Sequence, residues 1–307
     1  MTNTTNTTGT TGTTGTTGTT GTTGTTGTTG TDAGAAAVRT VLVTGATGKT
    51  GRRVAERLAA RGTAVLAGSR SGPVRFDWED PESWAPALAG ADAAYVNYYP
   101  DLAAPGAVAA MTAFGGAAAR AGVRRLTLLS GRGEPTAVAA EEALRAAADG
   151  IPLTVVRAAF FAQNFTEGLL AEGVAAGELV FPAGETAEPF VDVADLADVV
   201  VETLLSDAHA GLVHELTGPR PVTFAEVAAE LSRASGRPVA YVPVGRERYA
   251  ALLTGFGLPG PEAEWLADLF ATLLDGHNAS ATDGVKRVLG RDPRSFGRFA
   301  AEAARDA

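Results

Sequence analysis

The chain has 307 residues, a formal net charge of −9 and no cysteine. Without cysteine there is no disulfide, thiol nucleophile or cysteine-ligated zinc, and an acidic chain without a basic cluster disfavours a nucleic-acid surface. The three histidines, His209, His214 and His277, are scattered, and no apolar run approaches the ~18 residues of a membrane span. We therefore expect a cytoplasmic protein with no metal site, no nucleic-acid partner and no membrane partner.

Residues 1–37 differ in composition from the rest of the chain. Residues 1–31 are almost entirely Thr, Gly and Asn, with glycine at every third position through most of the tract. Because no apolar side chain follows Met1 there, the tract cannot build a core, and we predict that residues 1–37 are a disordered low-complexity segment. The tract also lacks the basic start and apolar stretch of a signal peptide. The folded protein is expected to begin near Val38.

A strand, a glycine-rich turn and a helix are predicted at the start of the folded part. The apolar run Thr40–Thr44 is followed by three glycines spaced three apart, and then by a helical pattern at about 50–61. This combination binds the pyrophosphate of a dinucleotide, because the glycines allow a tight turn, close approach to the phosphates and close helix packing. A purely structural turn is the alternative. The residues predicted to bind the cofactor here are Gly45, Thr47, Gly48, Lys49, Thr50 and Gly51.

The end of the second predicted strand, Ala64–Gly68, indicates which dinucleotide is bound. NAD-specific sites usually place an acidic residue there, about 20 positions on, to bind the ribose hydroxyls. In this segment no acidic residue precedes Asp77, and Arg70 stands between two serines instead. A guanidinium can meet two oxygens of a 2′-phosphate at once, so NADP(H) is preferred over NAD(H). The alternative is that Arg70 is an ordinary solvated loop residue.

Strand-like and helical patterns alternate through the first half of the folded part. Strands are predicted at Thr40–Thr44, Ala64–Gly68, Val74–Phe76, Ala93–Asn97, Arg125–Ser130 and Leu153–Arg157, and helices at about 50–61, 81–89, 106–121 and 136–148. This alternation is typical of an α/β fold with a Rossmann-type doubly wound parallel sheet. Ligands of such sheets bind at the carboxyl ends of the strands, so the residues that follow each strand are expected to carry the function.

The pattern changes after residue 178, where we predict a boundary. Residues 38–178 would form an NAD(P)-binding Rossmann domain, and residues 179–307 a smaller α+β C-terminal lobe on the substrate side, partly merged with it. Asp192 and Asp195 have the spacing of a helix start, and we interpret both as structural, because carboxylates cap helices and favour the positive end of the dipole. The patterns that follow are strands at Leu212–Leu216 and Val239–Val242, a helix at Thr223–Ser235 and a helical tail from Arg246.

Several motifs besides the glycine turn resemble a known family. They are Ala121-Gly122-Val123-Arg124-Arg125-Leu126 leading into Leu128-Leu129-Ser130, and Val155-Val156-Arg157 followed by Phe160-Phe161-Ala162-Gln163-Asn164-Phe165. With the turn, they resemble the NmrA-like, atypical short-chain dehydrogenase/reductase proteins. Gly48-Lys49-Thr50-Gly51, Ser69-Arg70-Ser71, Phe76-Asp77-Trp78 and the tail Leu289–Phe296 look more closely like the festuclavine dehydrogenase type of ergot alkaloid biosynthesis and its bacterial relatives. The resemblance runs from about residue 39 to the C-terminus, and Ala158 departs from it, because relatives usually carry proline there.

The resemblance implies an oxidoreductase of secondary metabolism and assigns residues to the cofactor. Asp77 would approach the adenine amino group, with Trp78 packed near it. Asn97, Tyr98 and Tyr99 would line the cofactor groove after the fourth strand. A structural role is the alternative for Trp78.

The resemblance also assigns residues to the nicotinamide and the substrate. Ser130 and the backbone of Ala159–Phe161 would border the nicotinamide. Phe160, Phe161 and Asn164 would face the substrate. Ordinary core packing is the alternative for the two phenylalanines.

The catalytic dyad of standard short-chain dehydrogenases is absent. Those enzymes place a lysine four residues after a tyrosine, and the lysine lowers the pKa of the phenol that donates the proton. None of the five tyrosines here is followed by such a lysine, and the chain contains only Lys49 and Lys286. The catalytic residue is therefore unknown. Tyr98 and Tyr99, as unassisted phenols, and Ser130 are weak candidates.

A site without the dyad can still transfer hydride to an acceptor that is already activated, such as an iminium ion or a quinone. Our leading hypothesis is an NADPH-dependent reductase of such a small molecule, aromatic or cationic, acting as a monomer or homodimer. The alternative from another class is a non-catalytic NADP(H)-binding redox sensor of the NmrA type. A sugar epimerase or dehydratase is disfavoured by the missing dyad.

Overall fold

The structure is a computed structural model that describes residues 37–305. The predicted disorder of residues 1–37 therefore lies, apart from Ala37, outside the described residues. Everything described below belongs to one compact unit that begins at Ala36.

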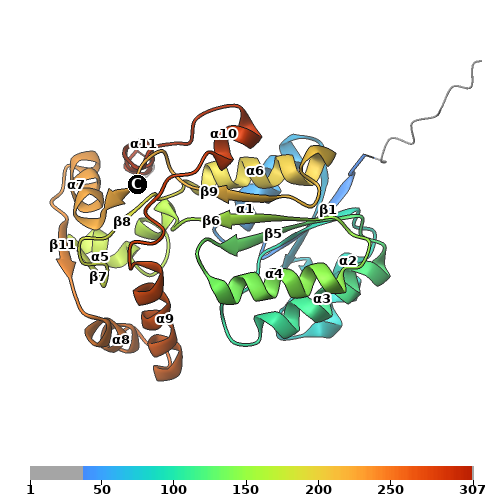
Figure 1. Cartoon of the computed structure of the whole chain (residues 1–307), viewed down its shortest axis with the longest axis horizontal. Helices are drawn as coiled ribbons and strands as arrows, with labels where there is room; N and C mark the ends of the chain where they lie inside the picture. The colour runs from blue at the N-terminus through green and yellow to red at the C-terminus, as the bar shows by residue number, and fades with distance from the viewer. Residues whose placement is uncertain (1–36, 306–307) are drawn as a thin grey trace, which may run out of the picture. The chain divides into compact units, whose positions relative to one another are not determined.

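A seven-stranded parallel sheet forms the centre of this unit, in the order β3-β2-β1-β4-β5-β6-β9 (Figure 1). The order reverses between β1 and β4, which makes the sheet doubly wound, and ligands of such sheets bind at this switch point. The strands alternate with helices, because parallel neighbours need crossover connections. The strands are β1 (Thr40–Thr44), β2 (Ala64–Ser69), β3 (Val74–Arg75), β4 (Ala93–Val96), β5 (Arg125–Gly131), β6 (Leu153–Ala158) and β9 (Val213–Leu216).

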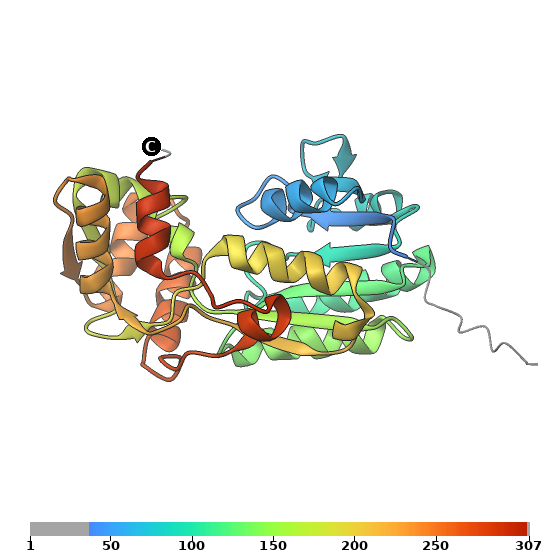
Figure 2. The same cartoon turned by 90° about the horizontal axis from the view of Figure 1, so that it is seen from above.

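Helices cover both faces of the sheet (Figures 1 and 2). On one face α2 (Trp84–Leu88), α3 (Ala107–Ala121) and α4 (Pro135–Ala147) pack together, and on the other α1 (Gly51–Ala60) packs beside α6 (Val193–Leu205). The strands are near-continuous apolar runs because both of their faces are buried; Val41, Leu42 and Val43 of β1, for example, are fully buried. The fold class predicted from the sequence is confirmed.

A smaller lobe stands at the carboxyl ends of the strands, at the left of Figure 1. Its core is a cluster of phenylalanine rings, among them Phe165, Phe181, Phe190 and Phe224. The lobe also contains two small sheets, one of β7 (Glu178–Phe181) with β11 (Ala240–Pro243) and one of β8 (Ala187–Glu188) with β10 (Val222–Thr223).

The remaining helices of the described residues, in both parts of the molecule, are α5 (Ala171–Ala176), α7 (Phe224–Ser235), α8 (Arg246–Gly255), α9 (Gly260–Leu273), α10 (Gly284–Leu289) and α11 (Phe296–Ala303). Short 3-10 turns lie at Pro81–Ser83, Ala162–Phe165 and Asp207–His209.

Residues 179–307 contribute to both parts of the molecule. The predicted strand Leu212–Leu216 is present as β9, but it pairs in parallel with β6 at the edge of the central sheet. Helix α6 likewise packs on α1, through the ion pair between Arg57 Nε and Asp198 Oδ1 at 2.6 Å. The segments that form the lobe are therefore separated in sequence by α6 and β9, which pack with the central sheet and its helices.

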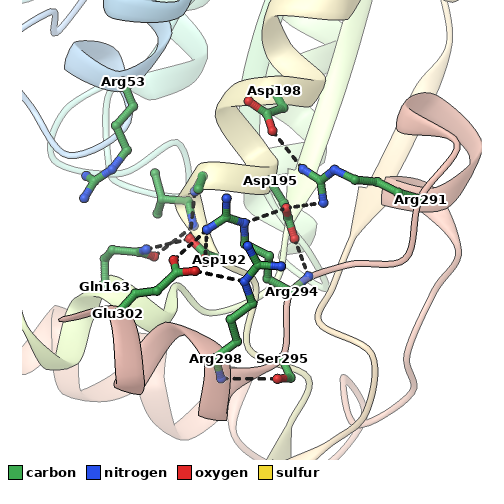
Figure 3. A network of polar contacts seen from close by, with 12 residues as sticks. Arg53, Gln163, Asp192, Asp195, Asp198, Arg291, Arg294, Ser295, Arg298 and Glu302 are labelled. Carbon is green, nitrogen blue, oxygen red and sulfur yellow. Dashed lines mark hydrogen bonds and ion pairs between the residues drawn. The ribbon is translucent and has the colours of Figure 1, made fainter. Parts of the chain in front are cut away.

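A network of polar contacts fastens the C-terminal tail to the start of α6 (Figure 3). Asp192 caps the helix, accepting a hydrogen bond from the backbone N–H of Ala194 at 2.8 Å. Asp195 is fully buried, accepts from the backbone N–H of Arg294 at 2.6 Å, and pairs with Arg291 at 2.7 Å. The structural interpretation of both aspartates is confirmed.

Candidate active site

The glycine turn between β1 and α1 has the geometry of a phosphate cradle. Gly45 has a φ of +61°, in the left-handed region that glycine tolerates best. A methyl group on Gly51 would overlap the carbonyl oxygen of Gly45 and lie 2.7 Å from its carbonyl carbon. Within the described residues, no side chain caps α1 through the N-cap Thr50, and no acidic residue stands in its first turn. The helix N-terminus is thus available to an anion, and the turn fits the pyrophosphate of a dinucleotide.

Asn97, which follows the last residue of β4, is hydrogen-bonded to residues on both sides of this turn. Asn97 donates from Nδ2 to Thr50 Oγ1 at 3.2 Å, and its backbone N–H donates to Thr44 Oγ1 at 2.8 Å. A methyl group on Gly45 would lie 3.2 Å from Asn97 Nδ2. Trp78 Nε1 donates to the carbonyl oxygen of Asn97 at 3.0 Å, and its ring packs edge-on against Phe76. Trp78 therefore has a structural role.

The end of β2 carries groups suited to a phosphorylated ribose. Ser69 is buried, and its Oγ has no hydrogen-bond partner among residues 37–305. Arg70 is exposed, and its guanidinium carbon lies 5.8 Å from the centre of the Tyr99 ring. Asp77 uses its carboxylate locally, accepting from the backbone N–H of Glu79 at 3.1 Å. Its expected approach to adenine stays a prediction.

A cavity of about 730 Å³ lies between the carboxyl ends of the strands and the lobe. It is the size of the pockets that bind small molecules and cofactors. The predicted site residues that line it are Lys49, Thr50, Asn97, Tyr98, Tyr99, Ser130, Phe160, Phe161 and Asn164. Those outside its lining are Gly45, Thr47, Gly48, Gly51, Arg70 and Asp77. The structure thus separates a turn and ribose region from a cavity that the predicted nicotinamide and substrate residues share.

Lys49 extends from the glycine turn into this cavity. Its Nζ donates to Asn164 Oδ1 at 2.6 Å, and burial lowers the pKa of the ammonium group despite the nearby carboxylate of Glu167. Glu167 in turn pairs with Arg52 and Arg53, at 2.6 Å each. These contacts tie the start of α1 to the loop after β6, and they commit the Oδ1 atom of Asn164 to Lys49.

Phe160 belongs to the lobe core and to the cavity wall together. Its ring centre lies 5.7 Å from Phe181 and 5.8 Å from Phe190, both in edge-on contacts. Phe161 packs with the sheet core instead, and its backbone forms an isolated parallel bridge with Val191. Phe160 therefore packs against the lobe core and also lines the cavity, while its contact with a substrate stays a prediction.

Glu141 occupies the helix that would carry the tyrosine–lysine dyad. It is almost fully buried, and it accepts from Ser130 Oγ at 2.6 Å, from Arg157 Nε at 2.9 Å and from an Arg157 terminal nitrogen at 2.7 Å. The hydroxyl hydrogen of Ser130 is thereby committed to Glu141, which weakens Ser130 as a proton donor. The sequence reasoning missed Glu141, since its contacts with Ser130 of β5 and Arg157 of β6 form only when α4 packs on the sheet.

The tyrosine candidates are also poorly suited to donate a proton near neutral pH. Tyr98 is half-buried, and burial, together with the negative charge of Glu79, raises the pKa of its phenol. Tyr99 is 67% exposed, so solvent would compete with an acceptor for its hydroxyl. Neither tyrosine is followed by a lysine four residues further along the chain.

Besides the exposed Glu262, three carboxyl groups that the sequence reasoning did not single out line the cavity: Asp101, Glu134 and Glu188. Burial is the main cause that raises the pKa of each, to about 8 for Glu134 and about 7 for Glu188. Glu134 stands at the N-cap of α4, where an acid ordinarily caps the helix, but it makes no capping hydrogen bond there. No sequence pattern distinguishes it from an ordinary cap.

Two features of the described residues bear on other classes of site. Across residues 37–305, His, Cys, Asp and Glu side chains form no group of three or more that could hold a metal ion. Over the same residues, none of the helices combines the length and apolarity needed to traverse a lipid bilayer.

The fold and the site together define a nicotinamide-dependent oxidoreductase. No family model matches the chain. It is 32% identical over 254 residues to the NAD(P)H azoreductase of Xenophilus azovorans, an alignment that covers 80% of this chain and 84% of that protein. It is also 31% identical to the agroclavine dehydrogenase of Claviceps fusiformis, over 59% of this chain and 65% of that one. The chain belongs to the NmrA-like, atypical short-chain dehydrogenase/reductase family.

Solved structures support the fold. The triphenylmethane reductase of a Citrobacter species, complexed with NADP(H), superposes with a TM-score of 0.66 at 23% identity, covering 87% of this chain and 99% of that one. The NADPH-dependent quinone oxidoreductase of Escherichia coli, complexed with NADPH, gives a TM-score of 0.67 at 23% identity, covering 85% and 99%.

Proposed function

We propose that the protein is an NADPH-dependent reductase that transfers hydride to a preactivated small molecule, an iminium ion, a quinone or a similar electrophile, without a tyrosine–lysine dyad. One observation carries the proposal: a single cavity joins the start of α1, through Lys49 and Thr50, to the aromatic wall at Phe160 and Phe161. The nicotinamide end of a cofactor seated on the glycine turn and an acceptor against the aromatic wall would therefore share this cavity. A sensor that only binds a cofactor has no need of the part of the cavity that the acceptor would fill.

The residues present fit such a cofactor and such a substrate. Reduced nicotinamide, when bound, supplies the hydride. The chain itself would bind the pyrophosphate at the turn, orient the acceptor and exclude water. Tyr98, Phe161 and Trp265 line the cavity, and aromatic faces stack planar acceptors and attract cations. The names of two relatives, an azoreductase and a quinone oxidoreductase, agree with a reductase of such acceptors.

NADPH oxidation by the purified protein tests this proposal, with a cyclic iminium, several quinones and a simple ketone offered in parallel. Turnover with the activated acceptors but not with the ketone is the expected result. Binding of NADPH without turnover of any acceptor would favour the redox sensor instead.

Replacing Phe161 by alanine should lower turnover about 10- to 100-fold, because a loosely held acceptor loses the alignment that hydride transfer needs. NADPH affinity, measured by fluorescence titration, should stay unchanged. Phe256→Ala is the matched control, since that residue follows the last residue of α8 and is 65% exposed. Equal turnover in the two variants would contradict the place of Phe161 beside the acceptor.

Replacing Arg70 by glutamate tests the preference for NADP(H). Affinity for NADPH should fall about 10- to 100-fold, since charge-assisted hydrogen bonds contribute about 1.5–3 kcal/mol, while affinity for NADH should hardly change. Arg145→Glu makes the same charge change at an exposed position on α4 and serves as the control. Equal losses for both cofactors in Arg70→Glu would remove the 2′-phosphate role.

A further inference from the structure

Two carboxyl groups from different elements meet in the lining of the cavity. Glu134 precedes α4, and Asp101 lies in the loop after β4. The two carboxyl groups lie close enough for each to shift the pKa of the other. The Oδ1 atom of Asp101 accepts a hydrogen bond from the backbone N–H of Ala103 at 2.8 Å, which stabilises the carboxylate form of Asp101. We therefore take Asp101 as the charged member of the pair and Glu134 as the member that carries the proton.

Glu134 is placed where an acceptor would react. It is 8% exposed, and its Oε2 has no hydrogen-bond partner within residues 37–305. Its carboxyl group lies directly over Gly131, where a methyl group would overlap it. Gly131 ends β5 and lines the cavity beside Ser130. An unpaired carboxyl oxygen is therefore buried at the strand end that borders the predicted nicotinamide position.

The surroundings keep this carboxyl group protonated at neutral pH. Burial is the largest cause, and the negative charges of Asp101 and then Glu141 add to it, so that the pKa of Glu134 is raised to about 8. The nearby cations are engaged elsewhere, Arg157 with Glu141 and Arg132 with Glu215 at 3.1 Å. The charged and titratable side chains on the surrounding elements are Asp101, Arg132, Glu141, Arg157, Glu188 and His277.

We propose that Glu134, beside Asp101, is the catalytic proton donor for the neutral acceptors of the proposed class, namely quinones and comparable conjugated carbonyl or azo compounds. The inference rests on the proposed reductase function. The acceptor gains a hydride, with both its electrons, and negative charge develops on its oxygen or nitrogen. The O–H bond of Glu134 then breaks, a new O–H or N–H bond forms on the product, and Glu134 is left ionised beside Asp101 until solvent returns a proton. An iminium ion needs no such proton, because hydride addition already gives a neutral amine.

Replacing Glu134 by glutamine keeps the shape of the side chain and removes the acidic proton. The variant should reduce a quinone about 100- to 10,000-fold more slowly, the usual contribution of a general acid, and a preformed cyclic iminium at nearly the original rate. Glu142→Gln is the matched control, since Glu142 is exposed on the same helix. In the unaltered protein the rate of quinone reduction should fall as the pH rises through about 8, because the carboxyl group then loses its proton, while the iminium rate should not follow this fall.

A second variant tests the influence of Asp101 on the donor, and a spectroscopic readout tests the donor without turnover. Asp101→Asn removes the charge that holds the proton on Glu134, so the fall in quinone reduction should move to lower pH. Infrared difference spectra of the cofactor-free protein, unaltered minus Glu134→Gln, should contain the C=O stretch of a protonated carboxyl group at neutral pH. This band should disappear as the pH rises through about 8.

Each contrary outcome has a definite meaning. Equal losses with quinone and iminium in Glu134→Gln, equal retention of both, or the absence of the infrared band would overturn the donor role and leave the proposed reductase function standing. Reduction of the iminium but not of any quinone by the unaltered protein would do the same. If the unaltered protein reduces neither acceptor, the proposed function fails and the donor role falls with it.

Discussion

Gly51→Ala should abolish measurable dinucleotide binding. The new methyl group would overlap the carbonyl oxygen of Gly45 and lie 3.0 Å from the Cα of Ala46. These are backbone atoms, which cannot rotate away as a side chain can, so either the turn opens or α1 retreats from β1. Overpacking of this kind costs typically 1–3 kcal/mol. A displaced turn also misaligns the N–H groups that would meet the pyrophosphate.

Isothermal titration with NADPH measures the loss of dinucleotide binding in Gly51→Ala, and urea unfolding measures the loss of stability. Gly255→Ala is the matched control, because nothing lies within 4 Å of a methyl group there and the position ends helix α8. That variant should bind NADPH normally. Unchanged NADPH affinity in Gly51→Ala would mean that the cofactor does not sit on this turn.

Arg157→Met should destabilise the protein by about 3–5 kcal/mol, the range measured when one partner of a buried ion pair is removed. Arg157 donates two hydrogen bonds to Glu141, whose side chain is only 1% exposed. Among residues 37–305, the variant leaves that carboxylate with only the hydroxyl of Ser130 as a close donor. The charge is then buried without compensation, and this accounts for most of the expected loss.

Urea unfolding curves check the prediction, and a double variant separates its causes. Arg157→Met with Glu141→Leu removes the stranded charge, so it should recover a large part of the lost stability. Arg233→Met is the control, because Arg233 pairs with Glu230 at the surface and its own side chain is 69% exposed. The control should unfold like the unaltered protein. A double variant as unstable as Arg157→Met would show that lost packing, not stranded charge, is the cause.

The elements around the glycine turn could be predicted because their signals are local. Strand β1 is found at the residues expected for it, Thr40–Thr44, and α1 begins within a residue of the expected start. Apolar runs of five or six residues between turn signals are enough to indicate buried strands, and helical periodicity marks the segments between them. The fold class follows from their alternation.

The position of β9 could not be predicted in this way. Its sequence indicates a strand, but the strand itself carries no information about its neighbour, and the chain passes through β7 and β8 of the lobe before returning to pair with β6. Pairing between distant strands depends on how the intervening segments pack. The lobe is consequently less continuous in sequence than a single boundary at residue 178 suggests.

The sequence by itself determined the fold class, the glycine turn, the absence of a tyrosine–lysine dyad and the family to which the chain belongs, because each of these is written in neighbouring residues or in a complete inventory. Only the tertiary structure decided which polar groups share the cavity. It directs Lys49 to Asn164, commits Ser130 to Glu141, and brings Asp101 against Glu134. The physical reason is that burial and the charges of distant neighbours set the protonation of a carboxyl group, and neither is visible until the chain has folded.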